Sequence, residues 1–257
     1  MKKINLQPSV VYGPLHSRRL GVSLGINLLP SLYKLCSFNC IYCQYGFTEK
    51  LVFDNIPADD FLKKSEIIQD IEIALTEIIK NRTEINFITF AGNGEPTLHP
   101  DFSDIVHEVI ALRDAIIPCA KLAILSNSST VTKPIIRDTL NLFDKKIMKL
   151  DAGDEETFRK INQAHSNINY DTLVDNLASF NNVTLQTLFL EGNISNSTDT
   201  NISSLITQYR KIKPELIQIY SLDREPADSL LKKVSPTRMR EIQETISGNV
   251  PFTVEVF

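Results

Sequence analysis

The sequence alternates between short apolar segments, typical of buried β-strands, and longer segments with the apolar spacing of amphipathic helices. β-rich apolar runs begin near residues 85, 121, 146, 183 and 216. The 25–37 residues between successive starts match the length of a βα unit. Apolar strands separated by helices predict a parallel sheet covered by helices.

Two sets of elements follow from this pattern. The expected strands cover residues 22–29, 85–91, 121–126, 146–151, 183–190, 216–222 and 252–256. The expected helices cover residues 65–80, 101–115, 133–143, 154–161, 170–180, 202–212 and 236–247. Six βα units predict an α/β fold, a partial (β/α)6 TIM-like barrel, with a flat doubly wound sheet as the alternative. Both folds place their site at the carboxyl ends of the strands.

No linker-like segment interrupts this pattern. We therefore expect a single domain over residues 1–257, with an N-terminal extension at 1–20 and a cysteine-containing loop at 31–48. The net charge of −4 gives no overall basic field that would attract nucleic acid or a membrane surface. The sequence has no 18-residue apolar run and no apolar signal-peptide core near its start, so we expect a cytoplasmic protein without membrane contact.

Three of the four cysteines fall within eight residues, as Cys36, Cys40 and Cys43 in a C-x₃-C-x₂-C pattern. In a reducing compartment such clustered thiols more often bind metal or perform chemistry than form disulfides. A zinc site completed by His16 or His99, a Cys40–Cys43 redox pair and three metal-free core thiols remain alternatives. An iron–sulfur cube held by three thiolates would leave one iron open for chemistry. The remaining cysteine, Cys119, is expected to be a structural thiol.

A glycine-rich turn, Ala91-Gly92-Asn93-Gly94-Glu95-Pro96, follows the strand expected at residues 85–91. Glycines at the end of a strand allow the backbone to approach a ligand closely. By itself this is a generic turn signal, so its meaning depends on the cysteine pattern.

Together the two motifs resemble the radical S-adenosylmethionine (radical SAM) superfamily. Its cysteine motif has an aromatic residue beside the last cysteine, where Tyr42 stands here, and Asn93–Pro96 stands where the family has a GGEP-type motif. The resemblance implies a [4Fe-4S] cluster held by Cys36, Cys40 and Cys43, with S-adenosylmethionine (SAM) on the open iron. One electron would cleave SAM to a 5′-deoxyadenosyl radical, which abstracts hydrogen from a substrate. By the same resemblance, the SAM-binding residues would be Tyr42, Gly92, Asn93, Gly94, Glu95 and Pro96.

Further polar residues lie on or just after the expected strands. They are Ser126, Asn127, Lys149, Asp151, Gln186 and Tyr220. Each can contact SAM or the substrate, or can equally cap an element or fill the barrel. Ser126, Asn127, Asp151, Gln186 and Tyr220 are therefore candidate cofactor-binding residues, and no catalytic residue is assigned.

Arg18 and Arg19 are adjacent and precede the first expected strand. Such a pair is usually solvated, but together with His16 it can bind a phosphate or a substrate carboxylate. After the sixth strand, Asp223 and Arg224 are expected either to lie near SAM or to pair with each other.

The motifs also resemble a small branch of the superfamily related to wyosine-type tRNA synthases. That resemblance does not extend to the tRNA reaction, because only Cys119 remains for a second cluster. The implied partners are an electron donor such as flavodoxin or ferredoxin and an unidentified small-molecule, RNA or protein substrate. Two other functions remain open: a radical activase of a partner protein, and a non-catalytic iron–sulfur or zinc sensor.

Overall fold

The computed structural model describes residues 4–54 and 56–257. Its centre is a sheet in the order β1-β2-β5-β6-β7-β8-β9-β11, and β10 pairs with β8. The main strands are β1 (Val11–Ser17), β2 (Gly21–Ile26), β5 (Phe87–Phe90), β6 (Lys121–Ser126), β7 (Lys145–Lys149), β8 (Val183–Gly192), β9 (Leu216–Ser221), β10 (Leu231–Lys233) and β11 (Thr253–Val256). Two short strands, β3 (Leu35–Cys36) and β4 (Lys50–Leu51), form a separate pair.

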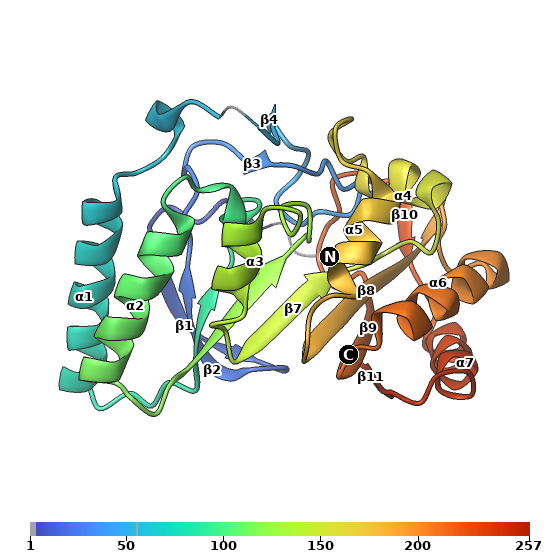
Figure 1. Cartoon of the computed structure of the whole chain (residues 1–257). Coiled ribbons are helices and arrows are strands. Elements are labelled where there is room, and N and C mark those ends of the chain that lie inside the picture. The colour runs from blue at the N-terminus through green and yellow to red at the C-terminus, as the bar shows by residue number, and fades with distance from the viewer. Residues whose placement is uncertain (1–3, 55) are drawn as a thin grey trace.

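The six strands from β2 through β5, β6, β7 and β8 to β9 are all parallel, and β11 adds a further parallel strand beside β9. The predicted α/β class and partial barrel are therefore confirmed. Helices lie outside the sheet (Figure 1). They are α1 (Lys64–Lys80), α2 (Phe102–Ile116), α3 (Pro134–Leu140), α4 (Glu155–Asn162), α5 (Tyr170–Leu177), α6 (Asp199–Ile212) and α7 (Pro236–Ser247).

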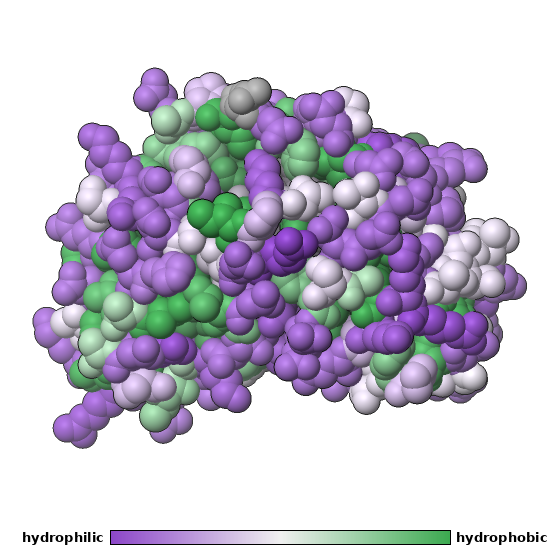
Figure 2. Space-filling view, in the orientation of Figure 1, coloured by the Kyte–Doolittle hydropathy of each residue, from purple (hydrophilic) through white to green (hydrophobic). Residues whose placement is uncertain are grey.

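The apolar faces of these helices build the core. In α1 the buried residues Ile67, Ile71, Leu75 and Ile78 recur at three- and four-residue steps, which places them on one face. Side chains from α1, α2 and the strands belong to one continuous buried cluster. On the face seen in Figure 2, hydrophilic side chains cover most of the surface. Within the described residues, every helix is too short or too polar to cross a bilayer.

The structure has strands that the sequence analysis did not predict. β1 pairs antiparallel with β2, so residues 11–17 belong to the sheet and are not a strandless extension. Most of its residues are exposed, and it contains Gly13 and Pro14, so it lacks the buried apolar centre of the central strands. The remaining unpredicted strands, β3, β4 and β10, have two or three residues, too few to show a period.

A close backbone contact joins the cysteine loop to the end of β5. The amide of Leu35 donates to the carbonyl of Asn93 at 3.2 Å, and Leu35 forms a parallel bridge with Gly94. A Cβ atom at Gly94 would lie 1.7 Å from the carbonyl oxygen of Leu35, and its φ of +151° disfavours other residues. Glycine at position 94 is therefore needed for the loop to reach the carboxyl ends of the strands.

We expect Gly94→Ala to lower the free energy of unfolding by about 2 kcal/mol or more, because the new methyl group meets backbone atoms. Urea denaturation of the metal-free chain, followed by circular dichroism, measures the change. The control is Gly248→Ala at the end of α7, where φ is −70° and the nearest atom is 3.3 Å away. It should change stability by no more than about 1 kcal/mol. Equal effects of the two substitutions would contradict the role of Gly94.

Candidate active site

Backbone hydrogen bonds hold the cysteine loop in place on both sides. β3 and β4 pair at its two ends, and a turn joins the amide of Cys43 to the carbonyl of Cys40 at 3.1 Å. On the far side, the amides of Asn39 and Ile41 each donate at 3.0 Å to carbonyls at the end of α4. Cys36 is buried, whereas Cys40 and Cys43 are partly exposed. The three cysteines therefore belong to one ordered loop across the strand ends.

Lys34 lies almost completely inside the protein, with 2% of its surface exposed. Its Nζ donates to the carbonyl of Gly46 at 2.9 Å. Burial acts to lower the pKa of Lys34, but the thiols of Cys43, Cys36 and Cys40 outweigh this effect, so the pKa is raised. One buried ammonium group thus interacts electrostatically with all three thiols of the motif.

Two side-chain amides point at the sulfur atoms. Asn127 Nδ2 lies 3.5 Å from the Sγ of Cys36, and Asn162 Nδ2 lies 3.5 Å from the Sγ of Cys40. Burial raises the pKa of Cys36 to about 12 and that of Cys40 to about 11. A reactive redox thiol needs a lowered pKa, and the raised pKa of Cys40 does not fit that role.

The histidines considered for a zinc site do not join the cysteines. Both ring nitrogens of His99 are engaged: Nε2 pairs with the carbonyl of Leu62 at 3.2 Å, and Nδ1 accepts from the amide of Asp101 at 3.1 Å. His16 is exposed on β1. Across residues 4–54 and 56–257, no three His, Cys, Asp or Glu side chains, the loop cysteines included, lie close enough together to share a single metal ion. Cys119 is a free, exposed thiol.

Glu95 joins the glycine-rich turn to the end of β6. Its carboxylate accepts from the amide and hydroxyl of Thr97 at 3.1 and 2.5 Å, from the hydroxyl of Ser126 at 3.0 Å and from the amide of Asn127 at 2.6 Å. Burial raises the pKa of Glu95 even though these hydrogen bonds act to lower it. Two predicted site residues, Ser126 and Asn127, are therefore brought directly to the predicted turn.

The Asn93 side chain is also fully engaged within the protein. Its Oδ1 accepts from the amide of Gln7 at 2.7 Å, and its Nδ2 donates to the carbonyls of Gln7 and Pro30 at 2.9 and 2.8 Å. Gly92 packs against Asn27, whose Oδ1 would lie 2.2 Å from an added Cβ. Pro96 begins the short 3₁₀ turn that follows. These contacts shape the backbone of residues 92–96.

A second polar network surrounds Asp151, just beyond β7. Its carboxylate accepts from the hydroxyl of Tyr42, from Lys149 Nζ at 2.8 Å, from Asn162 Nδ2 at 2.9 Å and from the amide of Leu188 at 2.9 Å. Burial, followed by the charge of Asp151, raises the pKa of Tyr42. The network therefore ties Tyr42, in the cysteine loop, to the end of β7 and to the middle of β8.

Lys149 connects this network to Tyr220 on β9. Its Nζ donates to the Tyr220 hydroxyl at 3.0 Å. Burial acts to lower the pKa of Lys149, but contacts with Asp151 and Tyr220 raise it overall. Gln186 lies apart, inside the barrel, and donates to Gln218 at 3.2 Å. The structure thus groups Tyr42, Asp151 and Tyr220, while Gln186 lines the interior.

The paired arginines separate in the structure. Arg18 is exposed and bonds Asp223 at 2.5 Å, and Lys233 bonds the same carboxylate at 2.6 Å. The alternative in which Asp223 pairs with Arg224 is therefore wrong. Arg19 instead turns inward beside Tyr220, with its guanidinium carbon 4.7 Å from the ring centroid. The turn between β1 and β2 directs the two side chains to different environments.

Comparison with known proteins connects this site to a family. The model of the radical SAM superfamily matches residues 31–193, a range that includes the three cysteines and the turn at 92–96. The chain belongs to the radical SAM superfamily. Radical SAM proteins use a [4Fe-4S] cluster and SAM, so these are the cofactors of the family to which the two motifs correspond.

Two curated relatives of this chain differ in how much of their length is matched. A protein named GTPase Obg from Brachyspira hyodysenteriae is 32% identical over 257 residues, which is 99% of this chain and 36% of that protein. A UPF0026 protein from Methanocaldococcus jannaschii is 31% identical over 227 residues, covering 87% of this chain and 67% of that protein. The chain therefore spans about a third of the first relative and two thirds of the second.

Solved structures share the radical SAM fold at low identity. A radical SAM methyltransferase from Sphaerobacter thermophilus has a TM-score of 0.69 at 14% identity, over 91% of this chain and 65% of that one. A structure of TYW1 with a lysine–pyruvate adduct bound has a TM-score of 0.59 at 14% identity, over 88% of this chain and 73% of that one. At this identity the likeness shows the fold alone.

Sequence reasoning missed two residues of this candidate site. Lys34 was not singled out, because a lysine beside Leu35 and Cys36 gives no sign in the sequence that its side chain is buried. Asn162 was missed because it is the last residue of α4 and distant in sequence from Cys40. Asn162 directly follows Ile161 in the helix, and its position there gave no signal of contact with the cysteine loop.

We expect Glu95→Gln to lower the free energy of unfolding by about 1–3 kcal/mol, because the new amide NH₂ would face a buried donor. Chemical denaturation of the metal-free chain measures the change. Glu84→Gln, at an exposed position, is the matched control and should be neutral within about 0.5 kcal/mol. If Glu95→Gln is as stable as the control, the four hydrogen bonds do not organise the turn.

Proposed function

We propose that this chain is a radical SAM enzyme that holds one [4Fe-4S] cluster through Cys36, Cys40 and Cys43 and binds SAM beside it. When bound and reduced, the cluster supplies the electron that cleaves SAM to methionine and a 5′-deoxyadenosyl radical, which abstracts hydrogen from a substrate. The observation that supports this most strongly is the position of the three-cysteine loop against the turn at 92–96. The family model also matches a range that includes both the loop and the turn.

The charges around the loop fit such a cluster. Three thiolates in a partly buried site need positive charge, and Lys34 supplies one unit beside all three sulfurs. Hydrogen-bond donors aimed at cluster sulfurs tune the reduction potential, and Asn127 and Asn162 are placed to donate in this way. Three ligands leave the fourth iron for SAM, the open position that chemistry needs.

The residues proposed to bind SAM divide into two kinds. The side chains of Asn93 and Glu95 already bind protein groups, so we propose that the backbone of Gly92–Pro96 faces SAM. Tyr42, Asp151 and Tyr220 belong to one network beside the loop, and we propose that they contact the adenosine part of SAM. We propose that Ser126 and Asn127, at the end of β6, also line the SAM site, and that Gln186 faces the substrate.

The reaction also needs partners. A one-electron donor such as flavodoxin or ferredoxin must reach the cysteine loop, and Cys40 and Cys43 are the two ligands that are partly exposed there. The substrate is proposed to enter the barrel interior, because that space lies next to the turn at 92–96.

We expect Cys40→Ala to lose both the cluster and SAM cleavage, because two thiolates do not hold a site-differentiated cube. After anaerobic reconstitution with iron and sulfide, the measurements are iron content, visible absorbance, and 5′-deoxyadenosine formed with dithionite and SAM. The unsubstituted chain should bind about four irons and release 5′-deoxyadenosine.

Cys119→Ala is the matched control, since it removes an exposed thiol outside the loop and should leave iron content and product unchanged. The proposal fails if the unsubstituted chain binds no cluster or never releases 5′-deoxyadenosine. It also fails if Cys40→Ala behaves like Cys119→Ala.

A further inference from the structure

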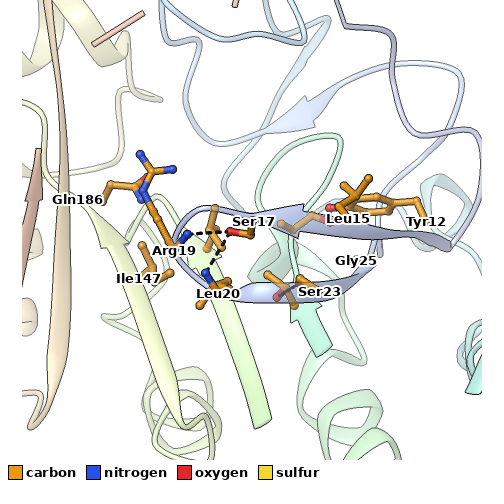
Figure 3. Close-up of a pocket in the computed structure, with 12 residues that line it drawn as sticks. Tyr12, Leu15, Ser17, Arg19, Leu20, Ser23, Gly25, Ile147 and Gln186 are labelled. Carbon is orange, nitrogen blue, oxygen red and sulfur yellow. Dashed lines mark hydrogen bonds between the residues drawn. The ribbon is translucent and has the colours of Figure 1, made fainter. Parts of the chain in front are cut away.

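A cavity of about 190 Å³ lies inside the barrel, between the β1–β2 hairpin and the strands β5 to β8 (Figure 3). Most of its wall is apolar. The apolar side chains that line it are Leu15, Leu20, Leu125 and Ile147. Ala91, immediately before the turn at 92–96, also lines it, so the cavity extends to the proposed SAM site.

The polar side chains of the wall are mostly satisfied within the protein. Ser23 and Thr89 share a hydrogen bond of 2.6 Å, and Gln186 donates to Gln218. The hydroxyl of Ser17 accepts from the amides of Arg19 and Leu20, each at 3.2 Å (Figure 3). These groups therefore need few further hydrogen bonds from a polar ligand.

Arg19 is the exception. Its guanidinium carbon lies 4.7 Å from the ring centroid of Tyr220 and 4.5 Å from that of Phe257, so two aromatic faces hold the group. Its Nε and Nη2 are buried and have no hydrogen-bond partner among the described residues. Leaving two charged donors unpaired in this way is costly, because each has lost its water.

No carboxylate of the described residues offsets this charge by direct contact. Asp223, an acidic side chain that acts on Arg19 from nearby, already pairs with Arg18 and Lys233. Burial is the largest effect on the pKa of Arg19 and lowers it. An arginine nevertheless stays protonated in proteins, so the cavity wall has one uncompensated positive charge.

The unpaired nitrogens indicate what would satisfy them. Nε and Nη2 share one edge of the guanidinium, and their N–H bonds run parallel, as a bidentate carboxylate requires. One cation balances one negative charge, which favours a carboxylate over a phosphate dianion. The remaining, apolar lining of the cavity suits a ligand with a short aliphatic chain.

We propose that the barrel cavity binds a small monocarboxylic acid with an aliphatic body, its carboxylate paired side-on with Arg19. This assignment rests on the proposed function in one respect: it makes the acid the substrate whose hydrogen is removed. Held at Arg19, the body of the acid lies along Leu125 and Ile147 toward Ala91, where the proposed SAM site begins. Arg19 is then a substrate-binding residue.

Ligand-observed NMR on the reconstituted full-length chain tests this, with valerate as the probe and pentanamide as its uncharged match in shape. We expect valerate to bind at least about tenfold more tightly than pentanamide, a difference of ~1.4 kcal/mol. Arg19→Gln should weaken valerate binding by a similar factor and leave pentanamide unchanged. Arg18→Gln, in the same turn but exposed, is the control and should bind valerate like the unsubstituted chain.

Three results would overturn the proposal: equal binding of valerate and pentanamide, unchanged valerate binding in Arg19→Gln, or Arg19-dependent binding of methyl phosphate that exceeds that of valerate. The comparison of the two probes on the unsubstituted chain stays decisive if Arg19→Gln does not fold. Binding is measured without SAM cleavage and is repeated on the metal-free chain. A chain that cleaves SAM but does not bind valerate contradicts only this inference, whereas a chain that binds valerate without forming a cluster contradicts only the proposed function.

Discussion

The backbone contact between Leu35 and Gly94 is the constraint on which the rest of the site depends. It fixes the cysteine loop against the end of β5, and it does so at a distance that excludes a Cβ atom. Glu95, next in the chain, then binds Ser126 and Asn127 at the end of β6. Asn127 in turn reaches the sulfur of Cys36. One close approach thus aligns the loop, the turn and two strand ends.

The site contains buried charged and polar groups that stabilise one another through direct interactions. Lys34 faces three sulfurs, and Asp151 accepts from four donors that include Lys149 and Tyr42. Arg19 is different, because its donors have no partner among the described residues and face a mostly apolar cavity. Groups that are satisfied internally hold the loop in place, whereas the unsatisfied group indicates a ligand. The hairpin β1–β2 positions Arg19 there, although the sequence of β1 gave no strand signal.

The sequence predicted the parallel barrel well because the central strands are short segments centred on buried apolar residues, which alternate with helical segments. It could not predict β1, whose exposed residues show no such pattern. Local spacing also identified the cysteine loop and the turn at 92–96. Contacts between distant residues were beyond it: Asp223 pairs with Arg18, 205 positions away, rather than with adjacent Arg224. The burial of Lys34 and Arg19 likewise follows from tertiary packing alone.

The central claim is that three cysteines hold a cluster whose fourth iron is open to SAM. Electron paramagnetic resonance of the anaerobically reduced chain, recorded with and without SAM, tests it most directly. The account predicts the signal of a reduced [4Fe-4S] cluster that changes shape when SAM is added, because SAM binds the open iron. A cluster signal that SAM leaves unchanged would contradict it.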